Sequence, residues 1–128
     1  MKLIPIDSHH VEHPFQKKML EKVRQRAQQA DLLTRIRLHQ NTPASIGLEE
    51  PVDFALAFWM VHEVANKEAF FREVRDLLKP TARFLVVEPK IHVKASAFDR
   101  IVGMARAAGL QLCSEVQVAI SRAALLAP

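Results

Sequence analysis

Apolar and polar positions follow two periods along this chain, one typical of helices and one of strands. Apolar residues recur at helical spacing from about Gln16 to Ala30, after Asn66 and from about Ser96. Continuous apolar runs lie between them at Val52–Phe58 and Arg83–Val87, as in strands that are buried on both faces of a sheet. The alternation predicts an α/β fold built on a largely parallel sheet.

Residues at the ends of these segments indicate where the helices begin and end. Asn66 can cap the second helix, and Pro80 is expected to end it. Ser96 and Asp99 have the spacing of a loose capping box at the start of the third helix, and Gly109 provides a C-terminal stop.

Three further regions have weaker strand patterns. Arg35–His39 predicts a short strand, and the loop Asn41–Gly47 follows it. Residues 110–126 predict two strands, the second of which (SRAALLA) can close the sheet as an antiparallel edge. A strand before the first helix is expected at Lys2–Ile6 or at Val11–Phe15.

The size and composition fit one globular domain. The chain has 128 residues, of which 49% are hydrophobic and 25% charged, so it can bury a core without disulfide support. The longest apolar run, Phe54–Val61, is far too short for a membrane span. Cys113 is the only cysteine, which favours a reducing cytoplasm, and its strand-like neighbours predict a buried position.

The charge and the histidines add no separate function. The formal net charge is +4. We interpret the one cluster of basic residues as the solvated face of the first helix, because no nucleic-acid motif accompanies it. The cluster consists of Lys17, Lys18, Lys22, Arg24 and Arg26. His9, His10 and His13 with Glu12 have the spacing of no standard metal site, so we predict no metal.

The ordered series of segments resembles the middle and C-terminal part of class I S-adenosylmethionine-dependent methyltransferases. The segments that show the resemblance are KKMLEKVRQRAQQADLLTRIRLH, VDFALAFWMVHEV, EAFFREVRDLLKP, FLVVEPKIHV and AGLQLCSEVQVAISRAALL. The resemblance implies a Rossmann-like methyltransferase sheet, mostly parallel with an antiparallel C-terminal strand. It also implies S-adenosylmethionine as the cofactor.

The chain departs from that family in its glycines. The family has a Gly-x-Gly loop after its first strand, where a Cβ would obstruct the cofactor, whereas this chain has only Gly47, Gly103 and Gly109, none of them paired. We therefore expect a fold truncated at the N-terminus. Two functions stay open: a methyltransferase-like domain that transfers a methyl group to an unknown acceptor, with residual or no activity, or a non-catalytic module that keeps the fold for interaction or assembly.

The resemblance also implies where the site residues lie. The cofactor-binding positions are Glu12, Asn41, Thr42, Phe58 and Trp59, and the substrate-side positions are His62, Glu63, Glu88 and His92. Each also has an ordinary structural interpretation: Asn41 as a loop residue, Phe58 as core, and His62 as a surface histidine or one bonded to a backbone carbonyl. No residue is assigned as catalytic.

The same resemblance raises the question of what pairs with Val52–Phe58. In the family the first strand lies beside this one, so its loss leaves an apolar strand with an unpaired side, which is an aggregation hazard. We expect Lys2–Ile6, a shifted N-terminal strand or a second chain to fill the place, which makes a homodimer through this sheet edge plausible.

Overall fold

A computed structural model describes residues 6–7, 14–42 and 44–128 of the chain. It divides into two compact units, Met1–Gly47 and Leu48–Pro128. Within the described residues, no helix is both long and apolar enough to span a membrane.

The first unit contains one long helix and a small parallel pair of strands. Helix α1 covers Pro14–Gln29, which confirms the predicted helix, and Ala27 is its buried residue among those described. Strand β1 (Ile6–Asp7) pairs in parallel with β2 (His39–Gln40). Ile6 thus belongs to a strand, whereas Lys2–Pro5 and Val11–His13 lie outside the described residues.

Two strand predictions in this unit are wrong. Pro14 and Phe15 lie in α1, so the alternative strand Val11–Phe15 is wrong for these two residues, and its other three lie outside the described residues. The predicted strand Arg35–His39 is also wrong in its extent, because Leu33–Arg35 forms a 3-10 turn, η1, and only His39 lies in β2.

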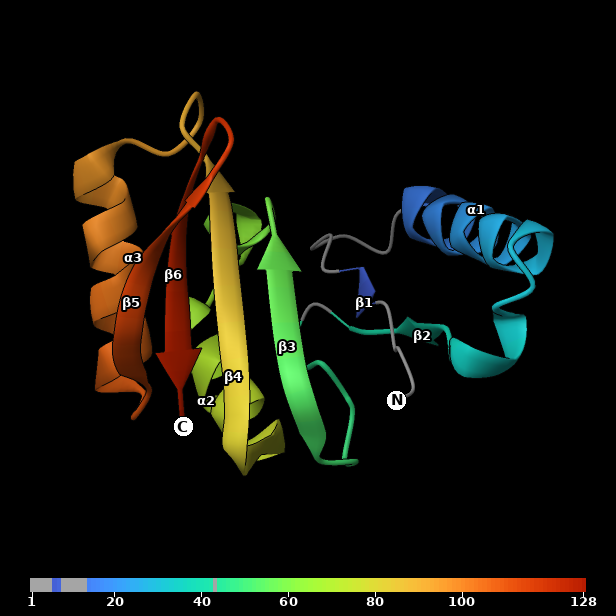
Figure 1. Cartoon of the computed structure of the whole chain (residues 1–128), viewed down its shortest axis with the longest axis horizontal. Coiled ribbons are helices and arrows are strands. Elements are labelled where there is room, and N and C mark those ends of the chain that lie inside the picture. Colours follow the sequence, from blue (N-terminus) through green and yellow to red (C-terminus); the bar gives the residue numbers. More distant parts are fainter. Residues whose placement is uncertain (1–5, 8–13, 43) are drawn as a thin grey trace. The chain divides into compact units, whose positions relative to one another are not determined.

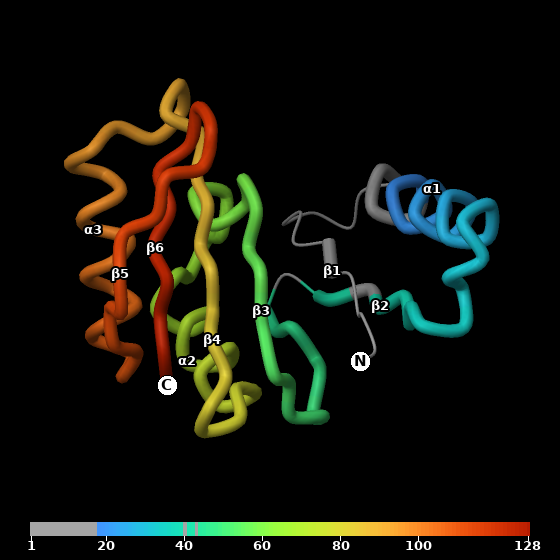
Figure 2. The backbone as a smooth tube through the Cα atoms, in the orientation of Figure 1, coloured from blue at the N-terminus to red at the C-terminus, as the bar shows by residue number. Residues whose placement is uncertain are grey.

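The second unit is built on a four-stranded sheet in the order β3-β4-β6-β5 (Figures 1 and 2). The strands are β3 (Val52–Phe58), β4 (Leu78–Pro89), β5 (Gln111–Val118) and β6 (Ser121–Ala127). Strands β3 and β4 are parallel, and β6 is antiparallel to both β4 and β5. The parallel neighbours and the antiparallel C-terminal hairpin are as predicted.

Two helices connect these strands. Helix α2 (Lys67–Leu77) is capped by Asn66, whose side chain accepts a hydrogen bond from the backbone N–H of Ala69 at 3.0 Å, as predicted. Helix α3 (Ala95–Ala107) is followed by Gly109 at a φ of +100°, a backbone conformation that favours glycine. The predicted capping box is wrong, because Lys94 is the N-cap residue and makes no side-chain cap, so Ser96 already lies inside the helix.

The core of this unit lies on one face of the sheet. Phe71 of α2 packs against Phe84 of β4 with ring centroids 6.1 Å apart, and α3 contacts α2 on the same face. The sheet residues beneath the helices are buried: Ala57, Phe84, Val86, Ala124 and Leu126.

The other face of β3 is open to solvent among the described residues. Phe54, Leu56 and Phe58 alternate with the buried side of the strand and are 48%, 57% and 51% exposed. The prediction that β3 is buried on both faces, and with it the core interpretation of Phe58, is therefore wrong. The reason is that both helices of this unit cover the same face.

Three smaller predictions need correction. Strand β6 lies between β4 and β5, so β5 and not β6 forms the edge. Pro80 does not end α2, which stops at Leu77, but lies at the start of β4, where the register with β3 shifts. Cys113 is exposed, because it lies on the outer strand β5 near another register shift.

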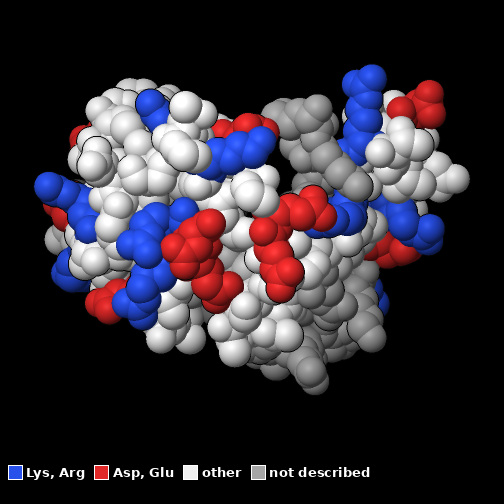
Figure 3. Space-filling model, turned by 90° about the horizontal axis from the view of Figure 1, so that it is seen from below, with Lys and Arg blue, Asp and Glu red and all other residues white. Residues whose placement is uncertain are grey.

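The basic residues of α1 whose side chains are described are exposed: Lys18, Lys22, Arg24 and Arg26. Arg24 forms an ion pair with Glu21 at 2.8 Å, and this hydrogen-bonded guanidinium lowers the pKa of the Glu21 carboxyl. On the face shown in Figure 3, basic and acidic side chains lie among one another.

Candidate functional site

The candidate site lies where the parallel strands β3 and β4 end. Strand β3 ends at Phe58 and continues into Trp59 and the 3-10 turn η2 (Val61–Glu63), while β4 ends at Glu88 and Pro89. Because Phe58 is in register with Val87, the two carboxyl ends meet at the same edge of the sheet. Open α/β sheets place their ligands at this edge.

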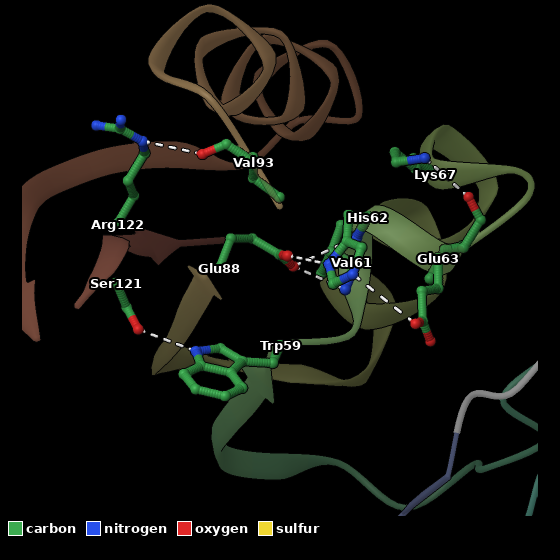
Figure 4. A network of polar contacts seen from close by, with 10 residues as sticks. Trp59, Val61, His62, Glu63, Lys67, Glu88, Val93, Ser121 and Arg122 are labelled. Carbon is green, nitrogen blue, oxygen red and sulfur yellow. Dashed lines mark hydrogen bonds and ion pairs between the residues drawn. The ribbon is translucent and has the colours of Figure 1, made fainter. Parts of the chain in front are cut away.

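Glu88 is the centre of the polar network in Figure 4. Its side chain is completely buried, and its Oε1 accepts hydrogen bonds from the backbone N–H groups of Val61, at 2.7 Å, and His62, at 3.3 Å. Its Oε2 contacts Nδ1 of the His62 ring. A buried carboxylate is stable only when such partners replace the water that it has lost.

The contact with Glu88 favours one tautomer of the neutral His62 ring. An ionised carboxylate can only accept, so in that tautomer Nδ1 carries the hydrogen and Nε2 has the lone pair. The His62 side chain is 24% exposed, so the ring reaches solvent while its orientation is held from inside.

Two further side chains approach the His62 ring. Oε1 of Glu63 is 3.8 Å from Nε2 of His62. The His92 ring stacks on that of His62, with centroids 6.2 Å apart and planes 16° apart. The structure thus brings together all four positions that the resemblance places on the substrate side: His62, Glu63, Glu88 and His92.

Trp59 is fixed beside this network by its backbone and its ring nitrogen. Its φ of +57° is uncommon for a residue other than glycine, and its Nε1 donates a hydrogen bond to the buried Oγ of Ser121 at 2.9 Å. The ring stacks on Phe58 at a centroid distance of 5.0 Å and points toward Ser121, away from the Glu88 carboxylate (Figure 4). Trp59 therefore presents a fixed, 41% exposed aromatic surface at this edge.

Sequence reasoning did not find two residues of β6 that support this edge. Ser121 accepts from Trp59, and Arg122 donates from Nε to the backbone carbonyl of Val93, the residue after His92, at 3.1 Å. Their only signal in the sequence is two polar residues at the start of an otherwise apolar strand.

The predicted cofactor positions are distributed over both units. Asn41 and Thr42 follow β2 in the first unit, Phe58 and Trp59 belong to the second, and Glu12 lies outside the described residues. The Thr42 hydroxyl accepts from the backbone N–H of Ser45 at 3.1 Å, so it is part of a local turn. Asn41 donates from Nδ2 to the Thr42 carbonyl at 3.1 Å, and its buried Oδ1 has no hydrogen-bond partner among the described residues.

These residues fit only part of S-adenosylmethionine. An unpaired amide oxygen such as Oδ1 of Asn41 suits a donor like the amino group of adenine. The three glycines provide no cradle for the methionine portion: Gly47 lies beside His39 in the first unit, Gly103 lies within α3, and Gly109 lies against Arg75. In the described part of the chain, no group of three or more potential ligands could hold a metal ion.

Comparisons with known proteins identify the family and the fold of the chain. A family model described as a methyltransferase domain matches residues 8–86. A search of curated protein sequences gives no significant match.

Solved structures with the same fold cover nearly the whole chain at low identity. A SAM-dependent methyltransferase from Aquifex aeolicus matches 98% of this chain and 68% of its own length, with a TM-score of 0.78 and 17% identity. A methyltransferase from Pyrococcus furiosus matches 98% and 61%, with a TM-score of 0.71 and 14% identity. The mitomycin 7-O-methyltransferase matches 99% of this chain, which spans only 42% of that enzyme, with a TM-score of 0.74 and 14% identity.

Proposed function

Because the chain belongs to the methyltransferase domain family, we propose that it is a methyltransferase domain that uses S-adenosylmethionine and acts on a hydroxyl acceptor, with His62 as the proton acceptor. The observation that supports this proposal is the buried carboxylate of Glu88, which contacts Nδ1 of the partly exposed His62 ring and leaves Nε2 on the side of Glu63. A histidine oriented by a carboxylate in this way is a typical general base.

The chemistry divides between the cofactor and the chain. When bound, S-adenosylmethionine supplies a methyl group on a positively charged sulfur, which needs no further activation as a leaving group. The chain's own task is to orient the acceptor and to take its proton. A neutral hydroxyl is a weak nucleophile, so His62 Nε2 accepts the hydroxyl proton while the oxygen forms its bond to carbon.

Glu88 acts on this reaction through His62. Its carboxylate fixes the ring tautomer and stabilises the imidazolium that forms when Nε2 takes up the proton. The fixed surface of Trp59 restricts the acceptor to one side of the edge.

Glu88→Gln tests the role of His62 with little change in shape. An amide at position 88 offers an N–H to Nδ1, so the ring turns to the tautomer in which Nε2 carries the hydrogen and no longer accepts one. We expect methyl transfer to fall about 10²- to 10⁴-fold, the range that general base catalysis provides. Radiolabelled S-adenosylmethionine with a panel of phenols and hydroxy acids measures the transfer.

Glu115→Gln is the matched control, since Glu115 is an exposed residue on β5 and undergoes the same chemical change. Equal rates for Glu88→Gln and the unchanged chain would contradict a base role for His62. Calorimetry with S-adenosylhomocysteine decides the more basic question. An absence of binding at millimolar ligand would overturn the proposal in favour of a non-catalytic interaction or assembly module.

A further inference from the structure

Strand β3 has one unpaired edge in its sheet, and this edge lacks the usual protection. Its hydrogen-bond partner is β4, and no other described strand pairs with it. Natural edge strands are protected by charges, proline or bulges. From Phe54 to Phe58 the strand has no charged residue and no proline, and its register shift with β4 comes from extra residues on β4.

The opposite edge of the same sheet shows the contrast. Strand β5 reads QLCSEVQV, so polar residues, including the charge of Glu115, are spread along it. Its ladder with β6 contains a register shift between Leu112 and Ser114. Strand β5 is thus protected against pairing with another molecule, and among the described strands of this sheet β3 is the edge without that protection, at which association is favoured.

We propose that two copies of this chain pair through β3, antiparallel, about a two-fold axis at Ala55. This axis is the one that uses all seven residues of Val52–Phe58, because Trp59, with its φ of +57°, leaves the extended conformation. It places Phe54 opposite Leu56 of the other copy and Val52 opposite Phe58. Such cross-strand pairs of apolar residues are the unit of sheet stabilisation.

The one charge in the strand is compatible with this pairing. Asp53 forms an ion pair with Lys79 of β4 at 3.0 Å, and the axis places it opposite Ala57 of the other copy. The two Asp53 residues lie four positions apart along the joined strands, about 14 Å, which exceeds the screening length at physiological salt. The pairing also leaves the His62–Glu88 pairs at opposite ends of the joined sheet, so it does not depend on the proposed function.

A cysteine on the axis tests the register directly. In the full chain with Cys113→Ser, Ala55→Cys places two thiols opposite each other, about 5 Å apart between Cβ atoms, so mild oxidation gives a covalent dimer on a non-reducing gel. Phe58→Cys in the same background is the control. Its two copies lie six positions apart along the strands, about 20 Å, and give no dimer beyond random collision.

A charge on the strand tests the association itself. Leu56 is 57% exposed, so Leu56→Lys leaves the fold intact, which circular dichroism verifies. Sedimentation equilibrium is expected to show that the dimer dissociation constant rises about tenfold or more, because the two-fold axis places two copies of the new lysine in the interface. Val116→Lys, on the outer strand β5, leaves that constant unchanged. A monomer at all concentrations, or equal cross-linking of Ala55→Cys and Phe58→Cys, would overturn the proposal.

Discussion

At the scale of single residues, the hydrogen bond between Trp59 and Ser121 joins a partly exposed residue to a buried one. Ser121 is 3% exposed and its hydroxyl accepts from the indole N–H at 2.9 Å, while Trp59 is 41% exposed. When a hydrogen bond is broken, a partner that stays buried pays the full cost of desolvation, whereas an exposed one can turn to water.

We therefore expect Trp59→Phe to cost more than Ser121→Ala. The first change leaves a buried hydroxyl without its donor and lowers the free energy of unfolding by about 1–3 kcal/mol. The second removes the acceptor of an indole N–H on a residue that is itself 41% exposed, and it costs about 1 kcal/mol or less. Urea unfolding followed by circular dichroism measures both, and a larger cost for Ser121→Ala would contradict this account.

Glu88 shows how far single residues could be predicted from the sequence. The strand pattern and the family resemblance place both Glu88 and His62 after buried strands, and the structure brings them into contact. Their direct bond could not be predicted, because it joins residues 26 positions apart and depends on the register that pairs Phe58 with Val87. The burial of Phe54, Leu56 and Phe58 was predicted wrongly, since an apolar run has the same sequence whether one face or both are covered.

At the scale of elements, the two helices of the second unit begin differently. Asn66 caps α2 through a hydrogen bond to Ala69, while Ser96 lies inside α3 and caps nothing. Asn66→Ala should lower the free energy of unfolding by about 1 kcal/mol, and the matched change Ser96→Ala should leave it nearly unchanged or raise it slightly. Thermal unfolding of the two variants measures the difference, and equal shifts would refute it.

Gly103, within α3, has room for a side chain, whereas Gly109, which follows the helix, does not. At Gly103 a Cβ meets no atom within 4 Å, whereas at Gly109 it would come within 2.6 Å of Nη1 of Arg75, which donates to the Ala108 carbonyl. Gly103→Ala should stabilise the helix by about 0.5–1 kcal/mol. Gly109→Ala should destabilise the unit by about 1 kcal/mol or more, because φ is +100° and Arg75 must move. Denaturant midpoints of the two variants on either side of the parent value would support both expectations.

At the scale of the whole molecule, the two units differ in how much apolar surface they bury. Among the described residues of the first unit, Ala27 and Ile46 are the buried apolar ones, whereas the second unit has a continuous core over its sheet. Regions with few buried contacts open locally, and core strands open only in global unfolding.

Hydrogen exchange should therefore separate the units. We expect the amides of α1 to exchange fastest among the regular elements, and those of β4 and β6, which pair on both sides, to exchange slowest. Mass spectrometry of peptides from α1, β4 and β6 measures the order. Protection of α1 equal to that of β4 would show that the units unfold together.

The position of β6 also affects synthesis on the ribosome. Residues 121–127 are translated after all other strands of this sheet, yet they occupy an interior place between β4 and β5. Until they emerge, the nascent β4 has an open side and β5 has no partner in the ladder. A premature stop codon that removes these seven residues would delete the middle of the sheet and leave a chain prone to capture by chaperones or proteases.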